Sequence, residues 1–520
     1  MKADRPNILL IVTDHQAWHG RFAEGGFPID LPVWRAFTAE GACFDRAYSV
    51  CPLCTPARAS MLAGTYPSRH GLLWNTEYPR VDGLSDFRDD QRLYGHCLAE
   101  AGYRNAYVGK WHCGRRQVAQ DFGLEGWSLP DYGKPYMSQA YRDYAERRGL
   151  APSEAFIEHW LGHPDEVGRS HRLHHEQAFY FENASGVLAG PPEGHLDKFV
   201  ANMAAEKLDE LARGPQPWSL VASFWGPHHP YLPTEPFAGK VDPRAIPQYP
   251  TFDDDLATRP FRHWEHRYIR HGRPRDQWPE WSTWQEVLAR AYEQQMQVDH
   301  AVGNLLASLA ATGQADNTLV LWVADHGDAI GCHGGLWDKG STFTEETARV
   351  PLAIRWPAEF AGGARSDALV TNMDVTATML EAAGLGVPAE MDSRSLLALC
   401  RDDHCADWPD ELICEHHGHH TRIAQRIVVT NRYKYVAALY DGDELYDLRE
   451  DPYETSNLVC SPDHREIARE MRDRLIRHID ATQDALAAGQ MRFWLEGAFG
   501  AQSPCEPLPP RETTSAHLSD

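Results

Sequence analysis

Four short apolar segments, each followed at once by charged or imidazole side chains, restrict most strongly what this chain can fold into. They are residues 6–14 (PNILLIVTD), 103–112 (YRNAYVGKWH), 218–231 (WSLVASFWGPHHPY) and 317–328 (NTLVLWVADHGD). None of them alternates between apolar and polar positions, which is typical of strands that are buried on both faces. They therefore predict a large, mostly parallel sheet with helices on both sides.

Helical patterns lie between these strands, and the clearest covers residues 285–310. Strands that alternate with helices predict an α/β/α sandwich, which we assign to a catalytic domain over residues 1–405. Two ranges of weak periodicity, about 130–215 and 232–285, are rich in Pro, Trp, His and Arg. We expect them to be insertions over the sheet edge.

The sequence changes character near residue 411. Short segments such as TRIAQRIVVTN and YKYVAALY, separated by turn signals, predict a small antiparallel sheet. A helix follows, with Ser461 as its N-cap and Pro462 at its first position. Its predicted apolar face consists of Ile467, Met471, Leu475 and Ile479. We expect residues 406–520 to form an α+β subdomain with an extended tail after 498, which could hold a homo-oligomer together.

Composition excludes several classes of function. With 50 basic and 74 acidic residues the formal net charge is −24, so nonspecific binding to nucleic acid or anionic lipid is not expected. A local basic pocket could still hold a small anion. No segment has the apolar length of a membrane span or of a signal peptide. The 11 cysteines, an odd number scattered along the chain, favour mostly free thiols in a reducing compartment and hence a cytoplasmic location.

The acidic residues after two of the strands suggest a metal site. The carboxyl ends of strands in an open α/β sheet line the ligand site, and Asp14, Asp325 and His326 occupy such ends. Two carboxylates and an imidazole favour Ca²⁺, Mg²⁺ or Mn²⁺ over zinc. Alternatively, Asp14 only caps the next helix.

Cationic residues follow the strands or a Gly-rich turn as well, and they are Lys110, His112, His228 and Lys339. A single lysine is usually solvated surface. Several that converge near a metal would form a cage for a tetrahedral oxyanion.

Cys51 and Cys54 have C-x-x-C spacing, and Cys54 precedes a helix that ends near Gly64. A helix N-terminus and Arg58, one turn further on, favour an anion at residue 54. A redox pair would need a thioredoxin-like context, and structural zinc would need a second pair at suitable spacing. Neither is found, so we interpret the pairing as chance and Cys51 as a bystander that lines the approach.

The segment Cys54-Thr-Pro-Ala-Arg58-Ala-Ser-Met-Leu-Ala-Gly64 resembles the C-x-P-x-R signature of the sulfatase family, within the alkaline phosphatase superfamily. NILLIVTD, GYRNAYVGKWHCG, PHHPY, ADHGDAIGCHGGLWDKG and ELYDLREDPYETSNL resemble further sulfatase blocks in the expected order. Together they cover most of residues 5–460. The resemblance implies an α/β/α sandwich with a C-terminal antiparallel subdomain.

The resemblance also implies that a formylglycine-generating enzyme converts Cys54 to formylglycine, whose hydrate is a geminal diol. One diol oxygen, activated on the metal, would attack sulfur and expel the alcohol. Deprotonation of the second hydroxyl would then eliminate sulfate. In this scheme the metal ligands are Asp14, Asp325, His326 and residue 54. Arg58 and Lys110 hold diol and sulfate, His112 is the base, and His228 and Lys339 contact the sulfate and help protonate the leaving oxygen.

Some positions depart from the usual sulfatase pattern. The pairs Asp14–His15 and Asp325–His326 stand where many sulfatases have Asp-Asp and Asp-Asn, and Ala57 stands where Ser is common. The Asp-His pair resembles phosphonate monoester hydrolases and related phosphodiesterases, often with Mn²⁺, whereas Lys110 and His112 resemble ordinary sulfatases. Ca²⁺ or Mn²⁺ is expected ahead of Mg²⁺, and whether His15 or Gln16 is a ligand stays open.

Three functions are compatible with these observations. The first is hydrolysis of sulfate esters, and the second is hydrolysis of phosphonate monoesters or phosphodiesters on the same scaffold. The third is a non-catalytic protein that stores metal through HRLHHE (171–176) and HHGHH (416–420). If either segment reaches the cleft, we expect it to recognise the leaving group. Aryl, choline-like, sugar and amino-sugar leaving groups all remain open.

Overall fold

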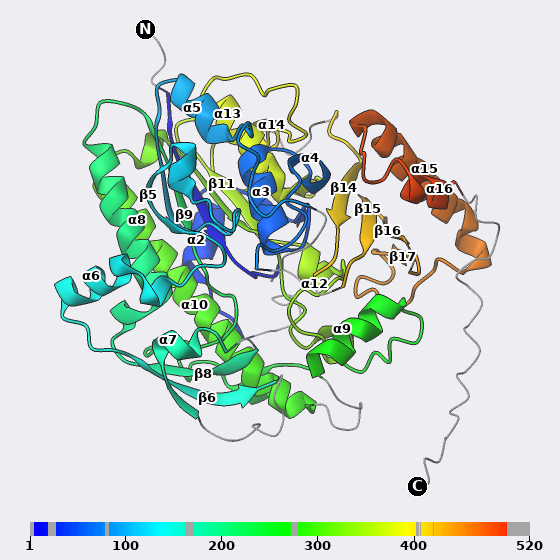
Figure 1. The fold of residues 1–520 in the computed structure, drawn as a ribbon, viewed down its shortest axis with the longest axis horizontal. Coiled ribbons are helices and arrows are strands. Elements are labelled where there is room, and N and C mark those ends of the chain that lie inside the picture. Colours follow the sequence, from blue (N-terminus) through cyan, green and yellow to red (C-terminus); the bar gives the residue numbers. More distant parts are fainter. Residues whose placement is uncertain are drawn as a thin grey trace.

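A computed structural model of the chain describes residues 5–18, 28–77, 83–161, 171–181, 183–271, 279–401, 405, 407–419, 421–439 and 441–496. Within them, eight strands form one central sheet (Figure 1). In spatial order they are β12 (Ala364–Ser366), β2 (Ala42–Phe44), β11 (Leu352–Arg355), β10 (Thr318–Ala324), β1 (Asn7–Thr13), β9 (Trp218–Ser223), β4 (Arg104–Lys110) and β5 (Glu125–Leu129).

The four strands predicted from the sequence lie side by side in the middle of this sheet. β1 pairs in parallel with β10 and β9, and β9 pairs in parallel with β4. Every residue of β1, β9 and β10 is buried, which explains why none of these strands alternates in polarity. The prediction of a mostly parallel sheet is confirmed, with β11 as an antiparallel strand between β10 and β2.

Helices cover both faces of the sheet (Figure 1). Leu10 and Val12 of β1 pack with α3 (Cys54–Ala63), α5 (Tyr94–Glu100) and α13 (Val375–Ala382) on one face. Leu9 and Ile11 face the other side, where α2 (Pro32–Ala39), α8 (Leu196–Ala212) and α10 (Trp281–Ala311) lie. The predicted helix 285–310 falls within α10, and the α/β/α sandwich is confirmed.

The range 130–215 contains more regular structure than its sequence suggested. Helices α6 (Gln139–Arg148) and α7 (His175–Ala178) flank a small antiparallel sheet of β6 (Glu154–Trp160), β7 (His171–His174) and β8 (Ala184–Ala189). The last part is not an insertion over the edge. Helix α8 buries Phe199, Val200 and Leu208 against the sheet, because these residues share one helical face.

The small antiparallel sheet predicted for the C-terminal part of the chain is confirmed, whereas the side-chain N-cap predicted for the helix after it is not. β14 (Glu411–His416), β15 (Ala424–Thr430), β16 (Tyr433–Leu439) and β17 (Glu444–Asp447) form an antiparallel meander. Helices α15 (Arg465–Thr482) and α16 (Gln490–Leu495) cover it, and Met471, Leu475 and Ile479 are buried. A short 3₁₀ turn, Pro462–His464, precedes α15, and Ser461 bonds to His464 rather than capping the helix. The predicted tail lies outside the described residues.

The remaining described strands and α-helices are short or join these layers. They are β3 (Ala47–Tyr48), β13 (Val370–Thr371), α4 (Pro67–His70), α9 (Phe261–His271), α11 (Cys332–Gly335), α12 (Glu345–Ala348) and α14 (Leu397–Arg401).

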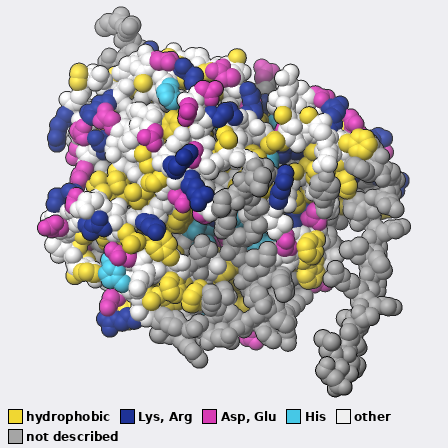
Figure 2. All heavy atoms as spheres, viewed as in Figure 1, with side chains coloured by type: hydrophobic (Ala, Val, Ile, Leu, Met, Phe, Trp, Pro, Cys, Tyr) yellow, Lys and Arg dark blue, Asp and Glu magenta, His cyan; other side chains and the backbone are white. Residues whose placement is uncertain are grey.

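The distribution of charged side chains and the state of most cysteines agree with the expectations from composition. Figure 2 shows acidic and basic side chains interspersed over one face, without a basic stripe among the described residues. Among the same residues, no helix combines the length and apolarity needed to cross a bilayer. Nine described cysteines are free thiols, and Cys460 is disulfide-bonded.

Candidate functional site

The floor of the site is formed where the central strands end. Asp14 follows β1, Asp325 and His326 follow β10, Lys110 ends β4, and Cys54 begins α3. All five side chains are buried. Backbone hydrogen bonds continue past the strand ends, since Asp14 N donates to the Gly226 carbonyl at 3.1 Å and Asp325 N to the Thr13 carbonyl at 3.0 Å. The sheet itself therefore fixes the positions of both carboxylates.

Two cations neutralise these carboxylates. Lys110 Nζ pairs with Asp14, and Arg58 Nε donates to Asp325 Oδ2 at 2.8 Å. Arg58 also approaches Asp14 Oδ2 at 3.8 Å. Burial alone would raise the pKa of Asp14, but Lys110 and Arg58 outweigh it and hold this pKa well below its usual range. The floor thus keeps charged carboxylates away from solvent.

Three of the predicted ligands, Asp14, Cys54 and His326, belong with His15 to a group of side chains that could hold a metal ion, and Asp325 lies beside this group without being part of it. His326 Nε2 lies 3.1 Å from Cys54 Sγ and 3.9 Å from both Asp14 Oδ1 and Asp325 Oδ1. His326 Nδ1 donates to the Gly327 carbonyl at 2.9 Å, which leaves Nε2 as the nitrogen with a free lone pair. Carboxylate, imidazole and residue 54 therefore offer donor atoms that could hold a divalent cation.

His15, rather than Gln16, lies in this cluster. Its ring nitrogens contact Asp328 Oδ2 at 3.3 Å and Lys339 Nζ at 2.6 Å. It is grouped with Asp14, Cys54 and His326 as a possible ligand. The amide oxygen of Gln16 instead accepts a hydrogen bond from Thr13 at 2.7 Å.

The remaining predicted residues surround Cys54. Lys339 Nζ lies 3.0 Å from Asp338. Burial opposes its charge, but the negative charges around it, Asp338 foremost, together outweigh burial and raise the pKa of Lys339. His228 Nδ1 donates to its neighbour's carbonyl at 2.5 Å. His112 Nε2 contacts the carboxylate of Glu77 at 2.8 Å. Despite burial, this carboxylate raises the pKa of His112.

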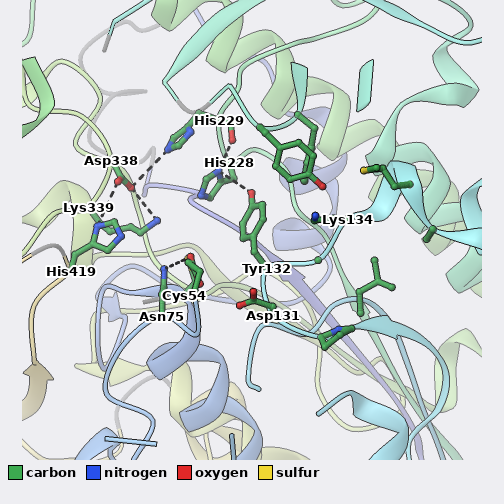
Figure 3. Close-up of a pocket in the computed structure, with 18 residues that line it drawn as sticks. Cys54, Asn75, Asp131, Tyr132, Lys134, His228, His229, Asp338, Lys339 and His419 are labelled. Atoms are coloured by element: carbon green, nitrogen blue, oxygen red, sulfur yellow. Dashed lines mark hydrogen bonds and ion pairs between the residues drawn. The ribbon is translucent and has the colours of Figure 1, made fainter. Parts of the chain in front are cut away.

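Above this floor lies a cavity of about 590 Å³. Of the predicted residues, Cys54, His228 and Lys339 line it, whereas the others are not among the lining residues: Asp14, Arg58, Lys110, His112, Asp325 and His326. Figure 3 shows two different walls. One is supplied by 129–134, Met137, Ser138, Phe179 and Tyr180, and the other by His229, Asp338, Lys339 and His419.

His419 shows that the segment HHGHH reaches the cavity. Its backbone N–H donates to Ser341 Oγ at 2.9 Å. Gly418 before it has φ 97°, and a Cβ there would lie 1.9 Å from the Thr421 carbonyl oxygen, so only glycine fits. In HRLHHE, by contrast, His174, His175 and Glu176 are grouped around β7 and α7 and do not line this cavity.

Cys51 does not have the predicted place. It is fully buried and is not among the lining residues, so the prediction that it lines the approach is wrong. Burial raises the pKa of its thiol well above the usual value. Cys51 and Cys54 are both free thiols.

Sequence reasoning missed several residues around the nucleophile: Asn75, Glu77, Asp131, Tyr132, His229 and Asp338. Asp338 and His229 adjoin predicted residues and could have been included for that reason. Glu77, Asp131 and Tyr132 lie in irregular segments without a motif, so no sequence signal pointed to them.

Comparisons with known proteins agree with this geometry. The family model described as "Sulfatase" matches residues 6–385, and "N-sulphoglucosamine sulphohydrolase, C-terminal" matches 331–481. The chain is 27% identical to the uncharacterized sulfatase YidJ of Escherichia coli and 28% identical to the choline-sulfatase of Rhizobium meliloti, covering in each case 95% of this chain and 91% of the relative.

Among solved structures, the phosphonate monoester hydrolase SpPMH of Silicibacter pomeroyi superposes with a TM-score of 0.73 at 22% identity, covering 93% of this chain and 97% of that one. This likeness concerns the fold. The first family model spans well over half of the chain, and its signature residues meet at the floor of one cavity. The chain therefore belongs to the sulfatase family, enzymes that hydrolyse sulfate esters.

Proposed function

We propose that this chain hydrolyses sulfate esters of small molecules through a formylglycine made from Cys54, with one divalent cation at Asp14, Asp325, His326 and residue 54. The observation that carries the proposal is the position of Cys54. It begins α3 at the base of the cavity, with His326 Nε2 3.1 Å from its sulfur. A cysteine so placed becomes, after maturation, a hydrated aldehyde that faces both the ligand set and the substrate.

The cation is proposed to be Ca²⁺ or Mn²⁺ rather than Mg²⁺, which demands a stricter octahedral geometry. When bound, it would supply positive charge that favours the ionised form of a hydroxyl and offsets the negative charge of the sulfate oxygens. Arg58 and Lys110 already place two positive charges against Asp14 and Asp325. They limit the negative charge of the ligand set, and we propose that they also hold the diol and sulfate.

In the first chemical step, one hydroxyl of residue 54 loses its proton, its oxygen attacks sulfur, and the bond between sulfur and the leaving oxygen breaks; the proton lost balances the one that the leaving alcohol gains. Lys339 and His228 line the cavity above Cys54, where they are placed to bind sulfate oxygens and to provide a proton for the leaving alcohol. In the second step, His112 takes the proton of the other hydroxyl. A C=O bond forms, the bond from carbon to the sulfate oxygen breaks, and sulfate departs. Water then rehydrates the aldehyde.

A second candidate is hydrolysis of phosphonate monoesters or phosphodiesters. The pair Asp325–His326 favours it, because the imidazole is one of the residues closest to Cys54 and this pair resembles that of phosphonate monoester hydrolases. Both substrates present a tetrahedral anion to the same cations. Comparing kcat/KM for sulfate and phosphodiester substrates with matched aryl leaving groups decides between them, and a preference for the phosphodiester would reverse the order of the two proposals.

The test of the maturation step is mass spectrometry of the peptide that spans residue 54, isolated from the native host. We expect the mass of formylglycine or of its hydrate, and loss of at least about 10³-fold in kcat for Cys54→Ala. Coexpression with a formylglycine-generating enzyme should raise the modified fraction and the activity together. An unmodified thiol in a fully active preparation would contradict the mechanism.

A further inference from the structure

Glu77 contacts the proposed base and has no part in the reaction described so far. Its Oε2 lies 2.8 Å from His112 Nε2. The side chain is 34% exposed and lines the cavity, whereas the imidazole is fully buried. His112 has a backbone φ of 52°, a conformation that non-glycine residues seldom adopt and that needs support from neighbours. Glu77 therefore bonds a ring whose backbone is held in an uncommon conformation.

Hydrogen bonds connect Glu77, His112 and the nucleophile helix in a closed circuit. Thr55, the residue after Cys54, donates through Oγ1 to the His112 carbonyl at 2.7 Å. Its backbone N–H donates to Asn75 Oδ1 at 3.1 Å. Asn75 Nδ2 in turn lies 3.4 Å from Glu77 Oε1, which is at the long end for a hydrogen bond. Thr55, the residue after Cys54, therefore contacts the backbone of His112 directly and is connected to its side chain through Asn75 and Glu77.

The contact with Glu77 also determines which ring nitrogen carries a hydrogen. A carboxylate only accepts hydrogen bonds, so Nε2 must be the nitrogen that donates. Nδ1 then has the lone pair when the ring is neutral. Nδ1 is buried and has no hydrogen-bond partner within the described residues, and Cys54 is among the side chains that interact with the ring. A neutral ring of this tautomer can accept a proton only at Nδ1, the nitrogen that Glu77 leaves free.

We propose that Glu77 is the positioning residue of the base: it holds His112 as the Nε2–H tautomer, with Nδ1 turned to residue 54, for the step that releases sulfate. The proposal rests on the function proposed above. His112 Nδ1 accepts the proton of the second hydroxyl while the bond from carbon to the sulfate oxygen breaks. Glu77 stays hydrogen-bonded to Nε2–H, and its negative charge lies beside the imidazolium ring that forms. A carboxylate behind an imidazole acts in this way in triads.

The expected result is a specific kinetic defect. With 4-nitrophenyl sulfate and matured enzyme, Glu77→Ala should lower kcat by about 10- to 100-fold, the range for a group that orients another. Formation of the hemiacetal should continue, so that one equivalent of nitrophenol appears as a burst and residue 54 carries an added SO₃ in the quenched peptide. Glu77→Gln keeps an acceptor for Nε2–H and should show a smaller defect than Glu77→Ala.

Two controls separate positioning from general effects. Glu100→Ala removes an exposed carboxylate that is paired with Arg92 outside the cavity, and should not accumulate the sulfated peptide. The double variant Glu77→Ala/His112→Ala should be no slower than His112→Ala alone. Melting temperatures identify variants that fail to fold. If Glu77→Ala is one of them, Glu77→Gln is used for the test instead.

The outcomes also separate this inference from the function on which it rests. If His112→Ala accumulates the sulfated peptide and both Glu77 variants do not, the positioning role is refuted and the base assignment stands. If matured His112→Ala shows neither the burst nor the added mass, the assignment of the base and the role of Glu77 fall together. An unmodified thiol at residue 54 in fully active enzyme refutes the proposed chemistry itself.

Discussion

The floor and the walls of the cavity are built on different principles. The floor uses the ends of central strands and the first turn of α3, and its residues Asp14, Cys54, Lys110 and Asp325 are at most 1% exposed. The walls use loops, short helices and the C-terminal subdomain, and Tyr180 among them is 42% exposed. A packed sheet holds charges that must not move, whereas irregular segments can change without disturbing the core. We expect chemistry to depend on the floor and choice of leaving group on the walls.

The largest effect should come from breaking the floor. His326→Ala removes the imidazole ligand, so metal affinity should fall at least tenfold. Activity at limiting metal should fall by roughly 10³-fold, because a bound cation contributes several kcal/mol to a reaction of this type. The loss should be the same for every leaving group. Elemental analysis after dialysis, with activity titrated against Mn²⁺ and Ca²⁺, measures it.

His300→Ala is the matched control, since this histidine is exposed, lies outside the cavity and belongs to none of the groups of potential metal ligands among the described residues. It should bind metal and turn over substrate like the unchanged chain. A His326→Ala protein with full metal content and full activity would show that the metal assignment is wrong.

A smaller and selective effect is expected at the wall. Tyr180→Ala should reduce kcat/KM for a bulky aryl sulfate by about 2- to 12-fold, which corresponds to the 0.5–1.5 kcal/mol of an aromatic contact. The ratio to a small alkyl sulfate should change by the same factor. Phe156→Ala, an exposed aromatic residue of β6 outside the cavity, should leave that ratio unchanged. Equal losses for both substrates would mean that Tyr180 supports the floor.

The smallest effect should be at Cys51, three residues from the nucleophile. Cys51→Ala removes a buried sulfur that is not in the cavity and is not disulfide-bonded. Stability should fall by about 1 kcal/mol, as for other small core truncations, with activity within about twofold of the unchanged chain. Thermal unfolding and aryl sulfate turnover test this. A large loss of activity would restore a functional role for the C-x-x-C spacing.

The same contrast explains what the sequence could predict. Asp14, Lys110 and Asp325 were found because each ends a buried apolar segment, and Cys54 because a recognisable helix follows it. Helix α8 was missed because its apolar face at Phe199, Val200 and Leu208 lies in a region dominated by Pro, Trp and His. Glu77 was missed because its function depends on a contact with His112 across 35 positions, and no local pattern records such a contact.

Burial of the nucleophile helix also has a consequence for the order of events during synthesis. All ten residues of α3 are buried, and Cys54 itself is 1% exposed. A maturation enzyme that binds the segment around Cys54 cannot reach it once the sheet and the C-terminal subdomain have closed around it. The conversion of this cysteine that we propose would therefore compete with folding, and the active fraction of a preparation would be decided before the chain becomes compact.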